Sequence, residues 1–345
     1  MRSLQAILGA ALAAGFSVCA LAQETREGAG IQWAGEHVLS PTPRGDGPRP
    51  NPRLIENGLP SVVLTGYWPP TNEMLRPWSP DPAQNGGVWV GENWRGLGYN
   101  VYAYFPEFPG GTGANPKGNG DFEVDYQDTS ADWWFLLDAV RPIAIITNSR
   151  ANTTRGWELE GGNGFYADSQ WTADYLVPTR PTPNEPHDPP GSQRSSSLPM
   201  QAIVDAVAAS AANVDPFIST FDDGRFLSNY IGYHGNWWRD THDDPSQPGR
   251  CYGSGHIHVG LSATVPDARL AMEVTLEVYL PEITRRRTDN TGDGTFDISD
   301  VDALFDCMTG PEVTLGAACA PTDTDQDVDG DLLDLALLQA SFGGP

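Results

Sequence analysis

Three observations predict a chain of two domains, the larger being a three-layer α/β/α domain with a mostly parallel central sheet. Short, wholly apolar segments recur through the middle of the 345-residue sequence, and helix-like segments lie between them. Strands that are apolar on both faces are typical of parallel sheets covered by helices on each side. The last part of the chain combines acidic loops with short amphipathic segments, which predicts a small all-α, EF-hand-like domain.

The N-terminal segment 1–22 has the composition of a secretory signal peptide. One early arginine precedes a long apolar stretch that ends in Ala20-Leu21-Ala22, so cleavage is expected before Gln23. The mature protein would then be secreted, extracellular or periplasmic; a lipid anchor on Cys19 is the alternative. No later apolar run is long enough to span a bilayer, so we expect no transmembrane segment after signal removal. Residues 23–58, rich in proline and glycine, are predicted to form an extended lead-in.

The α/β domain is predicted over residues 59–284. Short apolar runs predict strands at 61–65, 100–105, 143–147, 216–221 and 255–261. Longer amphipathic or apolar segments predict helices at 132–140, 198–214 and 268–280. Because parallel strands need crossover connections, this alternation favours a covered parallel sheet. Three loops at 110–120, 179–197 and around 240–254 are long for such a domain, which is typical of functional or disordered insertions.

Charge is distributed unevenly along the chain. The formal net charge is −25, from 45 acidic and 20 basic residues, and thirteen acidic residues but no basic ones follow Arg287. Nucleic-acid binding is therefore not expected, because phosphate contacts need a basic face. The concentration of acidic residues marks 285–345 as a separate domain.

Four cysteines occur in the sequence, one of them in the signal segment. Cys307 and Cys319 flank a Gly/Pro-containing loop, and their pairing is expected in an exported protein. Cys251 is then left over. We interpret it as a free thiol, because nothing in its loop would lower a thiol pKa as a nucleophile requires.

Two acidic loops in the C-terminal domain have the spacing of calcium ligands. The first, DNTGDGTFDISD at 289–300, places a glycine at the sharp turn and is followed by an amphipathic segment. Its predicted ligands are Asp289, Thr291, Asp293, the Thr295 carbonyl, Asp297 and Asp300. The second, DTDQDVDGDLLD at 323–334, is the weaker candidate because Val328 stands where the glycine belongs. Its predicted ligands are Asp323, Asp325, Asp327, Asp329, Asp331 and Asp334.

This pair of loops, over about residues 289–343, resembles a dockerin domain. The resemblance implies Ca²⁺ as the ligand of the module. It also implies docking to a cohesin-like scaffold protein, as in polysaccharide-degrading assemblies. The imperfect second loop and the linker between Cys307 and Cys319 depart from cellulosomal dockerins.

Three side chains in the α/β domain are candidates for catalysis. Ser228 follows the strand predicted at 216–221 and lies near the start of the next helix, His258 lies in the segment GHIHVGL, and Glu158 lies in RGWELEGGN. A serine hydroxyl needs an imidazole base, and the imidazole needs an orienting acid. A helix N-terminus also offers N–H groups to an oxyanion. Each residue has an ordinary structural interpretation too: helix capping, a strand histidine and surface charge.

The segments around these residues resemble the pyroglutamyl peptidase I (pyrrolidone carboxyl peptidase) family, in matching order over about 61–281. VVLTGYWPPTNEMLRPWS is similar to the family's first strand and its Thr-Gly-Phe-x-Pro loop, and GRFLSNYIGYH to its nucleophile helix. IAIITNSRANTTRGWELEGGN and GHIHVG resemble the segments with its glutamate and histidine. The resemblance implies a catalytic triad of Glu158, His258 and Ser228, needing no cofactor. Glu160 replaces Glu158 if the alignment shifts by two.

The same resemblance implies that Tyr67, Trp68 and Asn163 bind a peptide or small amide substrate. The departures concern the reaction itself. Ser228 stands where the family has cysteine, Pro70 replaces an aromatic residue of the first loop, and Asp168 falls near the position of an oxyanion-stabilising arginine. A catalytically inactive binding module of the same fold therefore stays open as an alternative.

A zinc-dependent hydrolase is the other alternative. His256 and His258 share one face of a strand because they are two residues apart, and His234 and His242 precede them. With Asp240, Asp243 or Asp244 these histidines have the chemistry of zinc ligands. No HExxH or comparable motif accompanies them.

Overall fold

The computed structural model describes residues 51–181, 188–220, 224–245 and 249–342. The predicted signal segment and most of the lead-in, together with residues 182–187 in one of the long loops, lie outside these ranges. The strands are β1 (Ser61–Thr65), β2 (Asn100–Tyr104), β3 (Pro106–Glu107), β4 (Asn119–Gly120), β5 (Ala144–Ala151), β6 (Gly156–Glu160), β7 (Gly162–Gly164), β8 (Gln193–Ser195), β9 (Asp215–Ser219) and β10 (Gly253–Gly260). The helices are α2 (Thr71–Leu75), α3 (Pro82–Asn85), α4 (Tyr126–Val140), α5 (Met200–Ala209), α6 (Leu227–Thr241), α7 (Val265–Arg287), α8 (Ile298–Cys307) and α9 (Leu332–Phe342).

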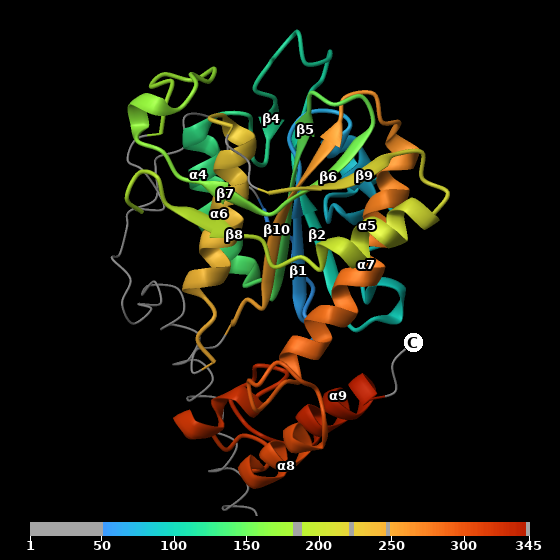
Figure 1. The fold of residues 1–345 in the computed structure, drawn as a ribbon, viewed down its shortest axis with the longest axis vertical. Coiled ribbons are helices and arrows are strands. Elements are labelled where there is room, and N and C mark those ends of the chain that lie inside the picture. The colour runs from blue at the N-terminus through green and yellow to red at the C-terminus, as the bar shows by residue number, and fades with distance from the viewer. Residues whose placement is uncertain (1–50, 182–187, 221–223, 246–248, 343–345) are drawn as a thin grey trace, which may run out of the picture. The chain divides into compact units, whose positions relative to one another are not determined.

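A six-stranded sheet in the order β2-β1-β5-β10-β6-β9 forms the centre of the α/β domain (Figure 1). Every neighbouring pair is parallel except β10 and β6, which run antiparallel. The predicted mostly parallel α/β fold is therefore confirmed. The sheet places the carboxyl ends of β1, β5 and β10 at one edge, where parallel sheets position their sites.

Alternating side chains divide the apolar core into two clusters, one on each face of the sheet. Leu64 of β1 and Ile257 of β10 belong to the cluster that includes α2, α5 and α7, whereas Val63 and Ile145 belong to the cluster that includes α4 and α6. Figure 1 shows α4 and α6 on one side of the sheet and α5 and α7 on the other. The three-layer arrangement follows, because each helix row covers one apolar face.

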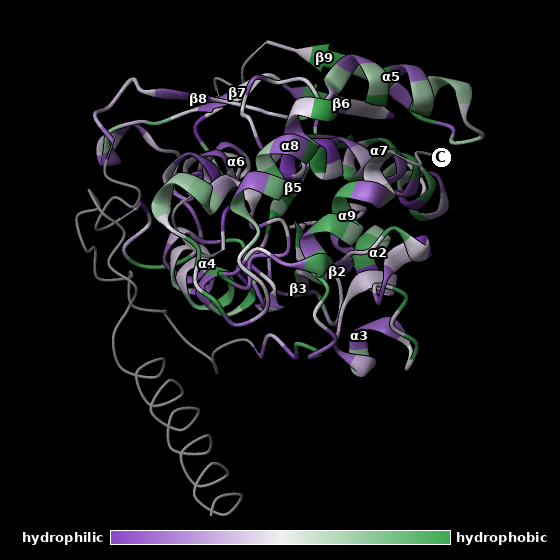
Figure 2. Cartoon of the chain, turned by 90° about the horizontal axis from the view of Figure 1, so that it is seen from below, coloured by the Kyte–Doolittle hydropathy of each residue, from purple (hydrophilic) through white to green (hydrophobic). Residues whose placement is uncertain are grey.

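Two strands differ from the sequence prediction: one is exposed at the sheet edge, and one was not predicted. The predicted strand at 216–221 is the edge strand β9, and Phe217 and Ile218 are 38% and 41% exposed rather than buried. Figure 2 colours this strand as hydrophobic. The sequence analysis did not predict β6, whose alternation of glutamates with Trp157 and Leu159 marks a strand with one polar face.

The C-terminal module contains α8 and α9, each preceded by one acidic loop. The disulfide Cys307–Cys319 forms as predicted and joins the end of α8 to the short 3₁₀ helix Ala317–Thr322. Of the helices in the described ranges, none has the length and apolar character needed to cross a membrane.

Candidate functional site

A pocket of about 230 Å³ lies at the carboxyl edge of the sheet and contains Ser228. Its other lining residues come from the loop after β1, the end of β5, residue 124 and the segment that enters α6. They are Tyr67, Trp68, Val124, Ser149, Arg150, Asn152, Phe226 and Leu227. The structure thus brings Ser228 together with two of its three predicted substrate-binding residues, Tyr67 and Trp68.

Ser228 occupies the first turn of α6 and is half-buried. Phe226, the residue immediately before the helix, supplies no side-chain hydrogen bond to the helix start, and no acidic residue lies in the first turn. The leading N–H groups therefore keep their partial positive charge toward the pocket. Such a helix start can stabilise negative charge that develops on a carbonyl oxygen beside the serine.

His258 lies near the end of β10 with carboxylates of β6 beside it. Its Nδ1 donates to Glu160 Oε1 at 2.7 Å, whereas Glu158 Oε2 lies 3.7 Å from the same nitrogen. Glu158 is the cross-strand partner of His258, and the histidine beside it lowers the pKa of this carboxyl below its usual value. Both acids contact the imidazole, but only Glu160 lies within hydrogen-bonding distance.

Glu160 is buried and has a second fixed contact. Its Oε2 accepts a hydrogen bond from Asn163 Nδ2 at 2.7 Å, and Asn163 Oδ1 accepts one from Asn236 of α6 at 3.0 Å. Asn163 does not line the pocket. Its contacts hold the Glu160 carboxylate in position, and its predicted role in substrate binding stays a prediction.

The position of Ser149 places His258 close to the pocket that contains Ser228. Ser149 lines the pocket with Ser228, and it is the strand partner of His258 in the parallel pairing of β5 with β10. Adjacent strands lie about 5 Å apart, so His258 lies next to the pocket wall. No hydrogen bond joins the Ser228 hydroxyl to His258 in the part of the chain that the structure describes.

A second serine–histidine pair, which the sequence analysis missed, lies on the same sheet face. Ser149 Oγ and His256 Nε2 are 2.7 Å apart, and His256 Nδ1 lies 2.7 Å from Thr147 Oγ1. The Thr147 hydroxyl donates to the Gly255 carbonyl at 3.3 Å, so the imidazole donates to Thr147 and accepts from Ser149. Burial lowers the pKa of His256 well below 6.5. The period-two pattern ITNS in β5 is the signal that predicts these inward hydroxyls.

The histidines of the zinc alternative do not converge on one site. Glu160, His256 and His258 form a group of potential ligands within 4.8 Å, and no such group among the described residues includes His234 or His242. His234 Nδ1 donates to the Tyr230 carbonyl at 2.8 Å, and His242 stacks on Trp238. Both nitrogens of His256 and both oxygens of Glu160 already have hydrogen-bond partners. This donor set fits a hydrogen-bonded network better than a metal site.

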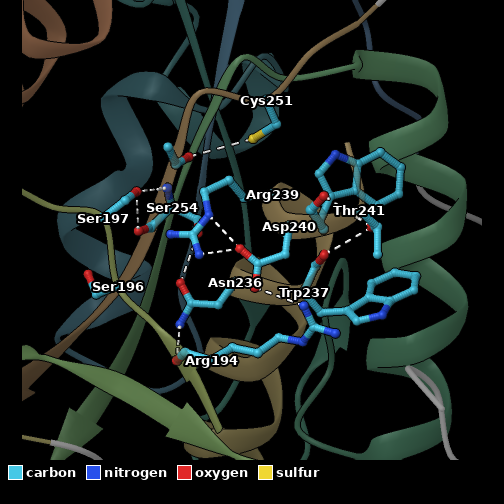
Figure 3. A network of polar contacts seen from close by, with 12 residues as sticks. Arg194, Ser196, Ser197, Asn236, Trp237, Arg239, Asp240, Thr241, Cys251 and Ser254 are labelled. Atoms are coloured by element: carbon cyan, nitrogen blue, oxygen red, sulfur yellow. Dashed lines mark hydrogen bonds and ion pairs between the residues drawn. The ribbon is translucent and has the colours of Figure 1, made fainter. Parts of the chain in front are cut away.

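Cys251 is buried and free, as predicted. Its Sγ lies 3.6 Å from the Gly253 carbonyl, and burial raises the pKa of the thiol to about 12. Figure 3 shows this sulfur with its own contact, near the hydrogen bond that the Ser254 hydroxyl donates to Asn236. A thiol held protonated in this way is not a nucleophile.

Lys117 is surrounded by three buried carboxylates of the segment that leads into α4 and of its first turn. Its Nζ lies 2.7 Å from Glu123, 3.4 Å from Asp125 and 3.0 Å from Asp128. Burial, together with the neighbouring acid Asp128, raises the pKa of Glu123 to about 7 and that of Asp125 to about 8. The acidic spacing of DFEVDYQD was the only sequence signal for this group.

The first acidic loop is closed by hydrogen bonds to its own carboxylates. The N–H of Gly294 donates to Asp289 at 2.8 Å, and the N–H of Thr291 donates to Asp300 at 3.0 Å. Gly294 has φ +83°, the left-handed conformation for which glycine was predicted at this turn. The carboxylates of the first and last acids, Asp289 and Asp300, therefore both point into the loop.

The second loop closes in the same way despite its departure from the motif. Val328 N–H donates to Asp323 at 3.0 Å, Asp325 N–H donates to Asp334 at 3.2 Å, and Val328 takes φ +75°. Carboxylate oxygens of Asp323, Asp325 and Asp334 lie within 4.8 Å of one another. Burial and neighbouring acids raise the pKa of Asp323 to about 6 and that of Asp325 to about 7. Such crowding is what a bound cation would relieve.

By sequence, no family profile and no curated protein matches the chain. Similar solved structures include the pyrrolidone carboxyl peptidase of Thermococcus litoralis, at 17% identity and a TM-score of 0.46, covering 64% of this chain and 94% of that one. Pyroglutamyl peptidase I of Bacillus amyloliquefaciens has 14% identity and a TM-score of 0.45, covering 64% of this chain and 95% of that one. The Pyrococcus furiosus pyrrolidone carboxyl peptidase has 18% identity and a TM-score of 0.44, covering 65% and 99%. These likenesses concern the arrangement of the elements and not the activity.

Proposed function

We propose that the α/β domain is an amide hydrolase that uses Ser228 as its nucleophile. The observation that carries this proposal is the position of Ser228. It lies on the uncapped start of α6, in an aromatic pocket whose wall adjoins the hydrogen-bonded pair His258–Glu160. The resemblance of the surrounding segments to pyroglutamyl peptidase I supports the same reaction class.

In the proposed reaction, Ser228 Oγ attacks the scissile carbonyl carbon while His258 takes the hydroxyl proton. The C–N bond breaks, the proton passes from His258 to the leaving amine, and an acyl ester remains on Ser228. Water then attacks this ester through the same base, releasing a carboxylic acid and restoring the serine hydroxyl. The first N–H groups of α6 stabilise the oxyanion in both halves.

We assign the orienting acid to Glu160, and Glu158 assists through its charge. The 2.7 Å hydrogen bond fixes the imidazole with its Nδ1 protonated, which leaves Nε2 as the basic nitrogen. Glu160 is itself held by Asn163. A buried, doubly bonded carboxylate keeps one orientation, as an orienting acid must.

The Ser149–His256 pair is the second candidate catalyst. It has the Ser–His hydrogen bond, at 2.7 Å, that Ser228 lacks among its described contacts. However, Ser149 is 3% exposed, and Thr147 rather than an acid orients its histidine. A neutral hydroxyl stabilises an imidazolium far less than a carboxylate does, so we assign Ser149 a positioning role.

Single-serine variants decide between the two assignments. Wild type, Ser228→Ala, Ser228→Cys and Ser149→Ala are assayed on a fluorogenic pyroglutamyl amide and a panel of other amides. We expect Ser228→Ala to lose at least about 1,000-fold in kcat, Ser228→Cys to keep measurable activity, and Ser149→Ala to lose far less. If Ser149→Ala loses activity and Ser228→Ala keeps it, Ser149 is the nucleophile instead. If neither wild type nor Ser228→Cys hydrolyses any amide, the result favours a catalytically inactive binding module.

We also propose that the acidic loops of the C-terminal module bind Ca²⁺ and that the module docks a cohesin-like scaffold. In the second loop, the converging carboxylates and their raised pKa values support calcium binding. In both loops, a backbone N–H at the turn donates to the first acid, and this shared closure supports calcium binding by each loop. Calorimetric titration with Ca²⁺ should give two sites per chain. Asp300→Asn and Asp334→Asn should each remove one, because each replaces the last acid of one loop. An unchanged titration in both variants contradicts the proposal.

A further inference from the structure

Among the described residues that line the Ser228 pocket, Arg150 is the one with a cationic side chain. It is exposed at the end of β5, and its guanidinium lies 4.7 Å from the centre of the Trp68 ring. Trp68 is itself fixed, because its Nε1 donates to the Pro116 carbonyl at 2.8 Å and its ring lies 6.1 Å from that of Tyr175. A cation stacked on an anchored indole has a defined position at the pocket.

No carboxylate pairs with Arg150 among the residues that the structure describes. That is unusual in a chain with 45 acidic and 20 basic residues. Arg155, five positions along, bonds Asp215 at 3.2 Å and Asn213 at 2.6 Å. With respect to the described part of the chain, the guanidinium of Arg150 keeps its planar pair of donors for another acceptor.

We infer that Arg150 binds a carboxylate of the substrate, so that the pocket selects small amides bearing an acidic group near the scissile bond. This inference rests on the proposed function for the position of the scissile bond. The other described lining residues are uncharged: they are aromatic, apolar or hydroxyl-bearing, except for the carboxamide of Asn152. The uncapped start of α6 adds positive potential, so both features favour an anion.

The volume of the pocket limits the size of the group that enters it. About 230 Å³ is below the range of about 300–1,000 Å³ typical of sites for drug-sized ligands. A short dicarboxylic acyl group, amidated at one end and ionised at the other, fits this space and charge. Hydrolysis of such a half-amide consumes one water and releases the dicarboxylate and the amine.

The test compares the mono-p-nitroanilides of succinate and glutarate with their methyl esters. Wild type, Arg150→Gln, Arg150→Lys and the control Arg155→Gln are assayed on each pair. We expect Arg150→Gln to raise KM for the ionised substrates by about 10- to 100-fold and to leave the esters within about twofold. Arg150→Lys should fall between, because it keeps the charge but not the planar donors. Arg155→Gln should resemble wild type.

A second measurement separates failure of this inference from failure of the proposed function. Succinate and glutarate are titrated calorimetrically into the Ser228→Ala protein and into Ser228→Ala/Arg150→Gln. Binding that the second substitution abolishes supports the inference whether or not any amide is hydrolysed. Equal affinity in both proteins, or no binding to either, overturns it. If Arg150→Gln lowers kcat equally on ionised and esterified substrates, the inference is also overturned. Arg150 would then stabilise the oxyanion rather than bind a substrate carboxylate.

Discussion

At the scale of single residues, the geometry changes which acid is assigned to His258. Glu158 and Glu160 lie on the same face of β6, two residues apart, so both point toward the imidazole. Only Glu160 is within hydrogen-bonding distance and buried. Sequence spacing cannot separate these two residues, because strand periodicity gives them the same orientation.

The first prediction follows from this difference. We expect Glu160→Gln to lower kcat/KM at least about 100-fold and Glu158→Gln less than about tenfold, because only the first removes the hydrogen bond that orients the base. Kinetics are measured from pH 5 to 9 on an amide that wild type hydrolyses. The Glu160→Gln profile should also shift its acidic limb to lower pH, since an imidazolium without its carboxylate loses its proton more readily. Equal losses in the two variants contradict the assignment.

At the scale of elements, α6 holds the site together through close contacts with its neighbours. Gly232 lies so near Asn163 that an added Cβ would meet its amide nitrogen at 2.5 Å, whereas a Cβ on Gly235 would meet Thr147 at 3.4 Å. The absence of a side chain at Gly232 is what lets the helix lie against β7. A Cβ on Gly232 would force Asn163 or the helix to move, whereas a Cβ on Gly235 would make an ordinary van der Waals contact.

The second prediction uses these two glycines as a matched pair. Gly232→Ala should lower the free energy of unfolding by about 1–3 kcal/mol, because the Asn163 side chain or the helix must move. Gly235→Ala should be neutral or raise it by up to about 1 kcal/mol, because alanine favours a helix. Urea denaturation of both variants measures the effect. Similar destabilisation by both would show that the contact with Asn163 is not responsible.

Also at the scale of elements, the sequence predicts where strands occur better than it predicts which strands pair in the sheet. The apolar runs correctly place β1, β2, β5 and β10, because local hydrophobic periodicity specifies strands. The edge position of β9 and the strand β6 were missed. Both depend on pairing between segments distant along the chain, which periodicity does not contain.

At the scale of the whole molecule, the buried acids around Lys117 make stability depend on pH. Their folded-state pKa values are raised, so the folded protein retains protons that the unfolded chain has released between about pH 4 and pH 8. This contribution to stability is present at acidic pH and is lost as the pH rises through the folded-state values. Stability from this group therefore falls from about pH 5 to pH 8.

The third prediction isolates this effect. Glu123→Gln should reduce the loss of unfolding free energy between pH 5 and pH 8 by on the order of 1–3 kcal/mol, because the amide does not ionise. Urea denaturation is measured at fixed, saturating Ca²⁺, so that the acidic loops contribute equally in both proteins. Parallel pH curves for wild type and Glu123→Gln contradict the prediction.

The acidic loops, the disulfide and the helix start that carries Ser228 could be predicted because each depends on residues close together along the chain, and the order of apolar and helical segments was enough to predict the fold class. Three contacts could be read only from the folded chain: Glu160 contacts His258, Ser149 pairs with His256, and Arg150 shares a pocket with Ser228. These contacts join different strands and loops, and their distances depend on strand register and helix packing. The chemistry of single residues is thus visible in the sequence, whereas their grouping into a site requires the fold.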